Sequence, residues 1–378
     1  MTLTSPHPYR PGPAAAPAGP GPGPGARAPA ATAPPLRATV LGHRHLVAAT
    51  CFLFVAMGTG LVTGPLSLSP SAVALELLSK VPLLHVRSPL SPTDALVVWQ
   101  LRLPEVVLGA LVGAVLAVSG AAYQGVFLNP LADPYLLGVA SGAGLGATVA
   151  IVSGSGTSSP FSLLPAAAFV GGVLAVAATF VLSRSRQGRS NASLLLAGVA
   201  VAAFFTAAQT FLQQQHSGLD LQVIYTWILG SVSTAGWSQV LLLLPYACLS
   251  CGTLLAGRRL LDTMSLGEEE AASVGLSVRH ARAVVIVAAT LGTAGAVAVS
   301  GLIGFVGIIV PHAVRLLAGP SYRRIVPLSL LYGAGFLVLA DVLARSVLSP
   351  QVLPLGVVTA FLAAPFFLVV LRRSQRGG

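Results

Sequence analysis

Long apolar runs, each about the length of a membrane-crossing helix, follow one another from residue 45 to residue 371. A helix needs roughly 20 mostly apolar residues to cross a lipid bilayer. This criterion predicts ten spans, which cover residues 45–66, 97–120, 135–153, 163–183, 192–213, 238–257, 281–300, 302–319, 327–347 and 355–371. We therefore predict an all-α polytopic membrane protein.

Two connections between the predicted spans are long enough to hold helices of their own. We expect residues 70–94 to form an extracytoplasmic loop that contains a short amphipathic helix. Residues 214–237 are expected to form a second such loop, or a partial helix that dips back toward the membrane.

The first 38 residues have a different composition from the rest of the chain. They hold 11 of the 28 prolines and no acidic residue. Proline fixes the backbone angle φ and lacks a backbone N–H, so a regular element is not expected there. We predict a disordered cytoplasmic tail over residues 1–38, followed by one transmembrane domain over residues 39–378.

The basic residues set the predicted orientation. With the N-terminus inside, all but four of the 21 Lys and Arg residues fall in cytoplasmic segments. The four that fall outside are Lys80, Arg87, Arg102 and Arg345. Cytoplasmic loops are enriched in Lys and Arg, so both termini are predicted to be cytoplasmic.

Composition narrows the possible functions. Only 8% of the residues are charged and 54% are hydrophobic, with a mean hydropathy of +0.84. A soluble enzyme of this length could not cover its surface with so few charges. A phosphate-binding loop needs a lysine, and the single lysine, Lys80, precedes Val81-Pro82. Any ATP hydrolysis must therefore come from a partner protein.

The net charge of +11 is explained by basic residues in the cytoplasmic loops rather than by nucleic-acid binding.

Neither a catalytic site nor a metal site is predicted. The seven histidines form no H-x-x-x-H or H-E-x-x-H motif, and Cys248 and Cys251 lie in an apolar run. Two acids, Glu105 and Asp341, lie in or near the spans, and Asp341 can pair with Arg345 four residues later. An ion-coupled transporter would need such buried acids, so this alternative stays open at this point.

Acidic residues concentrate in the longest cytoplasmic loop, residues 258–282. Glu268, Glu269 and Glu270 are consecutive, and Asp262 is close by. We predict a short helix with acids at its positive N-terminal end and a stop at Gly275. It is interpreted as a docking helix for a soluble partner such as an ATPase, and the alternative is a solvated loop helix.

A weak internal repeat is visible at an offset of 181 residues. Residues 117–120 (AVSG) recur at 298–301, and Pro130 corresponds to Pro311. The first copy is expected to end an inward-running helix and the second an outward-running one. Inverted repeats of this kind are common in transporters.

Longer motifs resemble those of a known family. They are RLP at residues 102–104, LVGAVLAVSGAAYQGVFLNPLADPYLLGVASGAGLGA from Leu111, LLLAGVA from Leu194, WILGS from Trp227, LGEEEAASVG from Leu266, SGLIGFVGIIVPHAVRLLAG from Ser300, ADVLAR from Ala340 and LPLGVVTAFLAAPFF from Leu353. Over residues 45–373 the chain resembles the FecCD permeases, the membrane subunits of ABC importers for ferric siderophores, haem and vitamin B12. The resemblance implies a ten-helix permease domain with both ends inside.

The resemblance also implies roles for individual residues. Arg102 and Arg345 match positions that dock an external binding protein, and Glu105 stands where the family often has a second arginine. The implied ATPase coupling residues are Glu268, Glu269, Glu270, Ala271 and Gly275. The implied cytoplasmic gate residues are Asn129, Leu131 and Asn191, the last at a position that is often threonine in the family.

The implied function is that of a multi-pass permease in the cell (inner or plasma) membrane. Its partners would be ABC ATPase subunits, an extracytoplasmic substrate-binding protein, and a second copy or a paralogue. This chain would bind no cofactor, since ATP and Mg belong to the ATPase subunits. The expected substrate is a ferric siderophore, with haem or cobalamin as alternatives and an ion-coupled secondary transporter as a more distant one.

Overall fold

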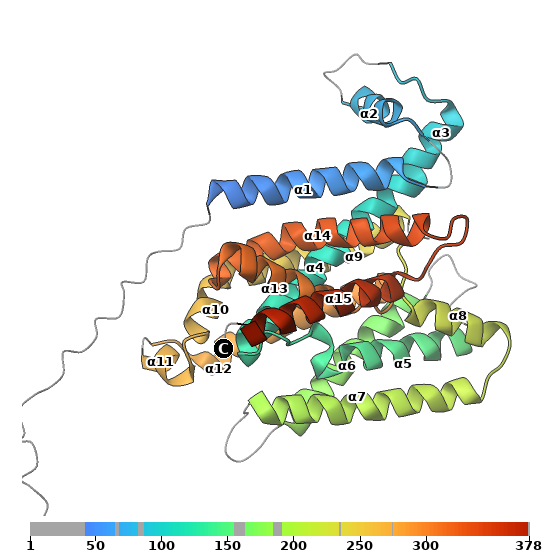
Figure 1. Cartoon of the computed structure of the whole chain (residues 1–378). Coiled ribbons are helices and arrows are strands. Elements are labelled where there is room, and N and C mark those ends of the chain that lie inside the picture. Colours follow the sequence, from blue (N-terminus) through green and yellow to red (C-terminus); the bar gives the residue numbers. More distant parts are fainter. Residues whose placement is uncertain are drawn as a thin grey trace, which may run out of the picture. The chain divides into compact units, whose positions relative to one another are not determined.

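The computed structural model describes residues 42–64, 68–81, 87–154, 163–183, 191–233, 236–273 and 275–376. The predicted tail lies outside these residues. The described part is built from helices (Figure 1), which are α1 His43–Val62, α2 Pro70–Ser79, α3 Pro92–Leu96, η1 Val97–Arg102, α4 Leu103–Phe127, η2 Pro134–Leu137, α5 Val139–Val152, α6 Leu164–Leu182, α7 Asn191–Gln214, α8 Leu219–Ile228, α9 Trp237–Ala256, α10 Arg258–Met264, α11 Glu268–Ser273, α12 Val278–Ser300, α13 Val306–Ala318, α14 Tyr322–Ser346 and α15 Leu355–Arg376.

Each of the ten predicted spans coincides with a helix, so the predicted fold class is confirmed. Among the described residues, seven helices are long and apolar enough to cross a membrane, and α5, α13 and the Leu355–Leu368 part of α15 are shorter apolar helices. The two expected helices in the connections are α2 and α8. Figure 1 shows α2, α3 and α8 at one end of the bundle, and α10, α11 and the C-terminus at the other.

Two predicted spans begin later than expected. Helix α5 follows the 3-10 turn η2 and Gly138, whose φ is +87°. Helix α13 starts only at Val306, because residues 301–305 form no helix and Phe305 has a φ of +69°. Hydropathy could not reveal these breaks, since Leu302, Ile303 and Phe305 are as apolar as helical residues.

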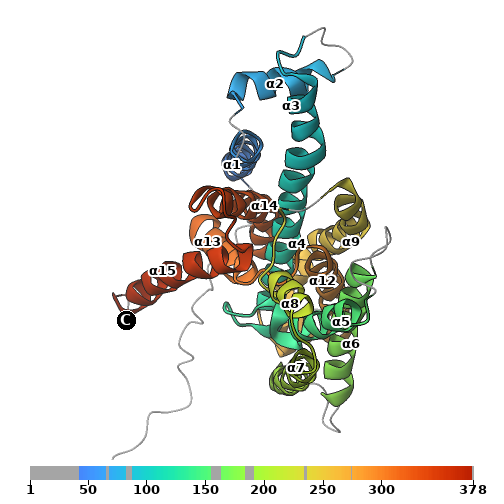
Figure 2. The same ribbon diagram turned by 90° about the vertical axis from the view of Figure 1, so that its right-hand side faces the viewer.

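Helix α4 is the centre of the bundle (Figure 2). Nearly all of its side chains are buried, and it packs against α9, α12, α13 and α14. Hydrogen bonds also join it to α12, from Ser119 Oγ to the Ala289 carbonyl (3.3 Å) and between Tyr123 and Thr290 (2.9 Å). An apolar helix that lipid surrounds has few such contacts, so α4 is an interior helix rather than a lipid-facing one.

Glycines allow close helix contacts around α4. A Cβ atom on Gly113 would lie 2.7 Å from Leu337 Cβ, and it would also clash with the backbone of Gly333 on α14. Gly120 meets the backbone of Gly307 on α13 in the same way. In a membrane, such close approach stabilises helix pairs through van der Waals contact, because lipid removes the hydrophobic driving force between helices.

The expected end of a helix at Gly120 is wrong. Residues 119–120 lie inside α4, which continues to Phe127, whereas Gly301 follows the end of α12 with a φ of +70°. The difference arises because Gly120 serves the α4–α13 crossing, while Gly301 adopts a turn conformation against the Trp227 carbonyl. The inverted repeat itself stays a prediction.

The outer helix α2 is fastened to the segment before α4. The indole N–H of Trp99 donates to Glu76 Oε1 at 2.8 Å, and the indole N–H of Trp237 donates to the Trp99 carbonyl at 2.9 Å. Hydrogen bonds from Ser88 and Trp99 lower the pKa of Glu76. This carboxylate therefore stays ionised and holds α2 in place.

We predict that Gly113→Leu destabilises the protein by about 1–3 kcal/mol or more, because the new side chain overpacks the α4–α14 crossing. Gly58→Leu on α1 is the matched control, since nothing lies within 4 Å of a Cβ placed there. Thermal unfolding in detergent, followed by size-exclusion chromatography, measures both. Equal stability of the two variants would contradict the role assigned to the crossing.

Candidate functional site

Arg102 enters the protein interior from an irregular helical turn. Residues 97–102 form a π-helix, in which the Leu103 N–H donates to the Val98 carbonyl five residues earlier. Pro104 follows and has no N–H to continue the regular pattern. The extra residue in the turn changes the direction of the side chains, and Arg102 is only 4% exposed.

The two predicted docking arginines both bind the end of α1. Nη1 of Arg102 donates two hydrogen bonds of 2.8 Å, and the Arg345 guanidinium on α14 donates two of 3.1 and 3.4 Å. The accepting carbonyls are those of Leu61, Val62, Thr63 and Gly60, respectively. A helix C-terminus has unpaired carbonyls and partial negative charge, so cations stabilise it.

Two carboxylates balance these arginines. Arg345 Nη2 lies 2.8 Å from Asp341 Oδ2, and Arg345 Nη1 lies 3.4 Å from Glu105 Oε2. The predicted Asp341–Arg345 pair is thus confirmed. We call Arg102, Glu105, Asp341 and Arg345 the outer charge cluster, and each member is at most 6% exposed. Glu105 supplies a compensating charge. Docking of a binding protein by Arg102 and Arg345 stays a prediction.

At the opposite end of the bundle, α11 has the predicted form. It begins at Glu268, and the Ala271 N–H bonds to the Gly267 carbonyl at 3.1 Å. Gly267 and Gly275, with φ of +118° and +83°, bound it on either side. The side chains of Glu268 and Glu269 lie outside the described part, Glu270 is exposed, and Ala271 is buried. The coupling role of this helix stays a prediction.

The predicted gate residues lie in a turn after α4. Leu128 ends α4 with a φ of 52°, and Asn129 Oδ1 accepts a hydrogen bond from the Leu131 N–H at 2.9 Å. The Leu128 and Leu131 side chains are about half exposed, at 49% and 52%. Asn191 begins α7, and its side chain is outside the described part. The turn has the exposed apolar side chains that a constriction needs, but the gate stays a prediction.

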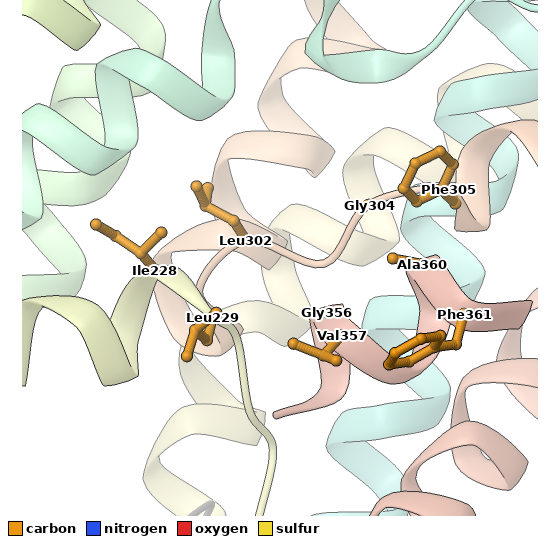
Figure 3. Close-up of a pocket in the computed structure, with 9 residues that line it drawn as sticks. All are labelled: Ile228, Leu229, Leu302, Gly304, Phe305, Gly356, Val357, Ala360 and Phe361. Carbon is orange, nitrogen blue, oxygen red and sulfur yellow. The ribbon is translucent and has the colours of Figure 1, made fainter. Parts of the chain in front are cut away.

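An apolar groove of about 490 Å³ opens where three irregular segments meet (Figure 3). Its lining residues are Ile228, Leu229, Leu302, Gly304, Phe305, Gly356, Val357, Ala360 and Phe361. Figure 3 shows Phe305 and Phe361 across the groove from Ile228. We call this surface the apolar groove.

Backbone hydrogen bonds hold the segments around the apolar groove together. The Ser231 N–H donates to the Ser300 carbonyl at 2.8 Å, and the N–H groups of Leu355 and Gly356 donate to the carbonyls of Gly230 and Leu229 at 2.9 and 3.0 Å. Irregular backbone at membrane depth is tolerated only where protein or a water-filled cavity surrounds it. These three segments therefore supply some of one another's backbone hydrogen-bond partners.

A second groove of about 410 Å³ adjoins the first, because Ile228 and Leu302 line both. Polar side chains from α5, α7, α8 and the η2 turn line it, namely Tyr135, Ser141, Thr206, Gln209, Thr210, Gln213 and Tyr225. We call this surface the polar groove. Among the residues that the structure describes, no Asp, Glu, Lys, Arg or His lines either groove.

Sequence reasoning missed the polar groove, although a signal was present. Thr206, Gln209, Thr210 and Gln213 follow the i, i+3, i+4, i+7 spacing of one helix face. They were included in an apolar run because alanine and phenylalanine surround them. Glutamine side chains are unfavourable against hydrocarbon, so this face of α7 is expected to meet water or protein.

A metal centre is not apparent in the parts of the chain that the structure covers. Among these residues, no group of three or more His, Cys, Asp or Glu side chains could hold an ion.

We predict that Arg345→Leu destabilises the protein by about 3–5 kcal/mol, because Glu105 and Asp341 lose their buried partner. Arg259→Leu, at an exposed position on α10, is the control and should change stability by less than about 0.5 kcal/mol. Adding Glu105→Gln and Asp341→Asn to Arg345→Leu should recover part of the loss. Unfolding temperatures in detergent test this, and an unchanged Arg345→Leu variant would refute the structural role of the cluster.

Comparisons with known proteins agree with this architecture. Residues 51–373 match the FecCD transport family. The chain is 41% identical over 283 residues to the cobalamin import system permease protein BtuC of Halobacterium salinarum, covering 75% of each chain. It is 40% identical over 293 residues to the hemin transport system permease protein HmuU of Yersinia pestis, covering 74% of this chain and 85% of that one.

A solved structure has the same fold. A protein described as a "putative metal-chelate type ABC transporter", solved in an inward-facing conformation, superposes with a TM-score of 0.75 and 32% identity, over 87% of this chain and 99% of the other. The family match spans most of the chain, and the helices agree with those of a solved transporter. The chain therefore belongs to the FecCD transport family and is a multi-pass membrane permease of an ABC transporter, not an enzyme.

Proposed function

We propose that this permease imports a ferric siderophore, and that a neutral chelate with many hydrogen-bonding groups is the substrate. The observation that carries this proposal is the pair of adjoining grooves, one apolar and one polar, which have no charged residue among their described lining residues. A bulky chelate with carbonyl and amide groups could contact glutamine and threonine side chains on one side and apolar surface on the other. The likeness to a metal-chelate transporter supports the same substrate class.

Haem and cobalamin are the competing substrates. The chain is about equally similar to a permease named for cobalamin and to one named for hemin, at 41% and 40% identity. Sequence identity therefore does not discriminate between them. Haem carries two carboxylates, which the uncharged lining of these grooves does not match. Cobalamin carries amides that the polar groove would accept, so it is the stronger alternative.

The energy for import would come from partner ATPase subunits, which bind ATP and Mg, because this chain has no phosphate-binding loop. A binding protein would deliver the substrate from outside, and a second copy or a paralogue would complete the pathway. An ion-coupled mechanism is disfavoured because Glu105 and Asp341 each face Arg345, which offsets their charge. Buried carboxylates that bind a transported cation are not expected to have such a partner.

The substrate is tested with the permease reconstituted in liposomes with its ATPase and binding protein. We expect ATP-dependent, saturable uptake of iron-labelled ferrichrome, a neutral ferric hydroxamate. Haemin and cyanocobalamin are offered under the same conditions. Preferential uptake of either one would replace the ferric siderophore as the substrate, and uptake without the ATPase would contradict the ABC mechanism.

The coupling proposal gives a second test. Replacing Glu268 and Glu269 by Lys should leave the protein in the membrane but reduce uptake strongly, because the acids at the start of α11 would no longer seat in the ATPase. Asp220→Lys on α8, at the opposite end of the bundle, is the matched charge change and should leave ATPase binding intact. Co-purification of the ATPase and substrate uptake are measured. Uptake at the wild-type rate in the double variant would exclude docking by these residues.

A further inference from the structure

Asp262 on α10 binds the first turn of α14. Its Oδ2 accepts a hydrogen bond from Ser321 Oγ at 2.9 Å, and its Oδ1 accepts one from the Tyr322 backbone N–H. Arg323 Nε lies 3.3 Å from Oδ2. The Asp262 side chain is 21% exposed, so these contacts are only partly open to water.

This contact replaces the usual local cap of a helix. Ser321 is the N-cap residue of α14, but its hydroxyl accepts no hydrogen bond from the helix's own N–H groups. It donates to Asp262 instead. A carboxylate at a helix N-terminus satisfies free N–H groups and interacts favourably with the helix dipole. Thus a residue of the cytoplasmic loop, and not a neighbour in sequence, caps α14.

Polar contacts continue from α14 to α13 and α4. Arg315 Nη2 on α13 donates to the Tyr322 hydroxyl at 3.1 Å and to Gln124 Oε1 at 3.2 Å. Gln124 on α4 donates in turn from Nε2 to the Gly307 carbonyl at 3.2 Å. The contacts that start at Asp262 therefore reach the first turn of α13 and the inner part of α4.

Tight packing accompanies these hydrogen bonds. A Cβ atom on Gly125 would lie 3.0 Å from Leu261 Cδ2 and 3.1 Å from the Tyr322 ring. Leu261 and Tyr322 are buried, at 0% and 5% exposure. Helices α10, α4 and α14 thus meet without free space, and α11 packs on α10 and α12. A displacement of α11 and α10 would reach α14 through this junction.

We propose that Asp262 is a positioning residue that transmits movement of the coupling loop, residues 258–282, to α14 and from there to α13 and α4. The inference rests on the proposed role of this loop in ATPase docking. It goes further by naming the residue through which a movement enters the membrane helices. Leu261 and Gly125 supply packing, whereas Asp262 supplies directional bonds to the end of α14.

The experiment separates transmission from helix capping. Asp262→Ala removes both functions, and adding Ser321→Asp restores a cap for α14 from within its own sequence. The double variant therefore regains capping but not the bond to α10. Asp262→Asn, which keeps an oxygen acceptor and loses the charge, is an intermediate variant. Asp220→Asn on α8 is the matched control.

Each variant is assembled with its ATPase and binding protein in liposomes. Three quantities are measured, namely the unfolding temperature, the stimulation of ATP hydrolysis by the binding protein, and substrate uptake. The uptake probe is ferrichrome, or haemin or cyanocobalamin if the wild type imports that compound instead. We expect Asp262→Ala to lower the unfolding temperature and to reduce stimulation and uptake about tenfold, within the usual range of coupling energies. The double variant should regain stability but not stimulation or uptake, and Asp262→Asn should lie between.

Two results would overturn the inference. One is uptake by the double variant that recovers together with its stability, because Asp262 would then be only a helix cap. The other is wild-type uptake and stimulation in Asp262→Ala. If Asp262→Ala does not assemble, the double variant decides the question. Failure of the proposed function looks different, because the wild-type complex itself would then show no ATP-dependent uptake of any of the three probes.

Discussion

Every backbone N–H and C=O group inside a bilayer needs a partner from the protein, since hydrocarbon offers none. The points where helices of this permease end follow from that requirement. Arg102 and Arg345 bind the last carbonyls of α1. Asp262 accepts a hydrogen bond from the Tyr322 N–H, the first of α14, and another from the Ser321 hydroxyl. The segments around the apolar groove satisfy part of the same need by hydrogen bonds between loops.

The buried or partly buried acidic residues described above each contact a structural partner. Glu105 and Asp341 face Arg345, Asp262 caps a helix, and Glu76 holds α2 against the segment before α4. The acids that sequence reasoning considered for ion coupling therefore have structural partners. The described residues that line the two grooves, in contrast, carry no charge. This division differs from that expected of an ion-coupled transporter, in which buried acids would bind the transported cation.

The helices that coincide with the ten predicted spans were predictable because their apolar runs are long and polar connections separate them. The short helix α11 was predictable from its acidic start and its glycine stop. The break before α13 was not, because Leu302 and Phe305 look like helix residues. The partners of Arg102 were not predictable either, since the α1 carbonyls lie about 40 residues earlier and meet it only after folding. The spacing of Gln209 and Gln213 places them on one helix face, but the surrounding alanines made the segment read as uniformly apolar.

Helix α14 is fastened at both of its ends, by Asp262 at the first turn and by the outer charge cluster at the last. A helix held only along its sides can slide or rotate between its neighbours. One that is pinned at both ends resists sliding and rotation, so it moves mainly by tilting as a rod. With 25 residues it is about 37 Å long. A displacement that enters at Asp262 would therefore be carried along α14 to the outer charge cluster, and α1 would follow, because Arg345 binds the carbonyls of Gly60 and Thr63.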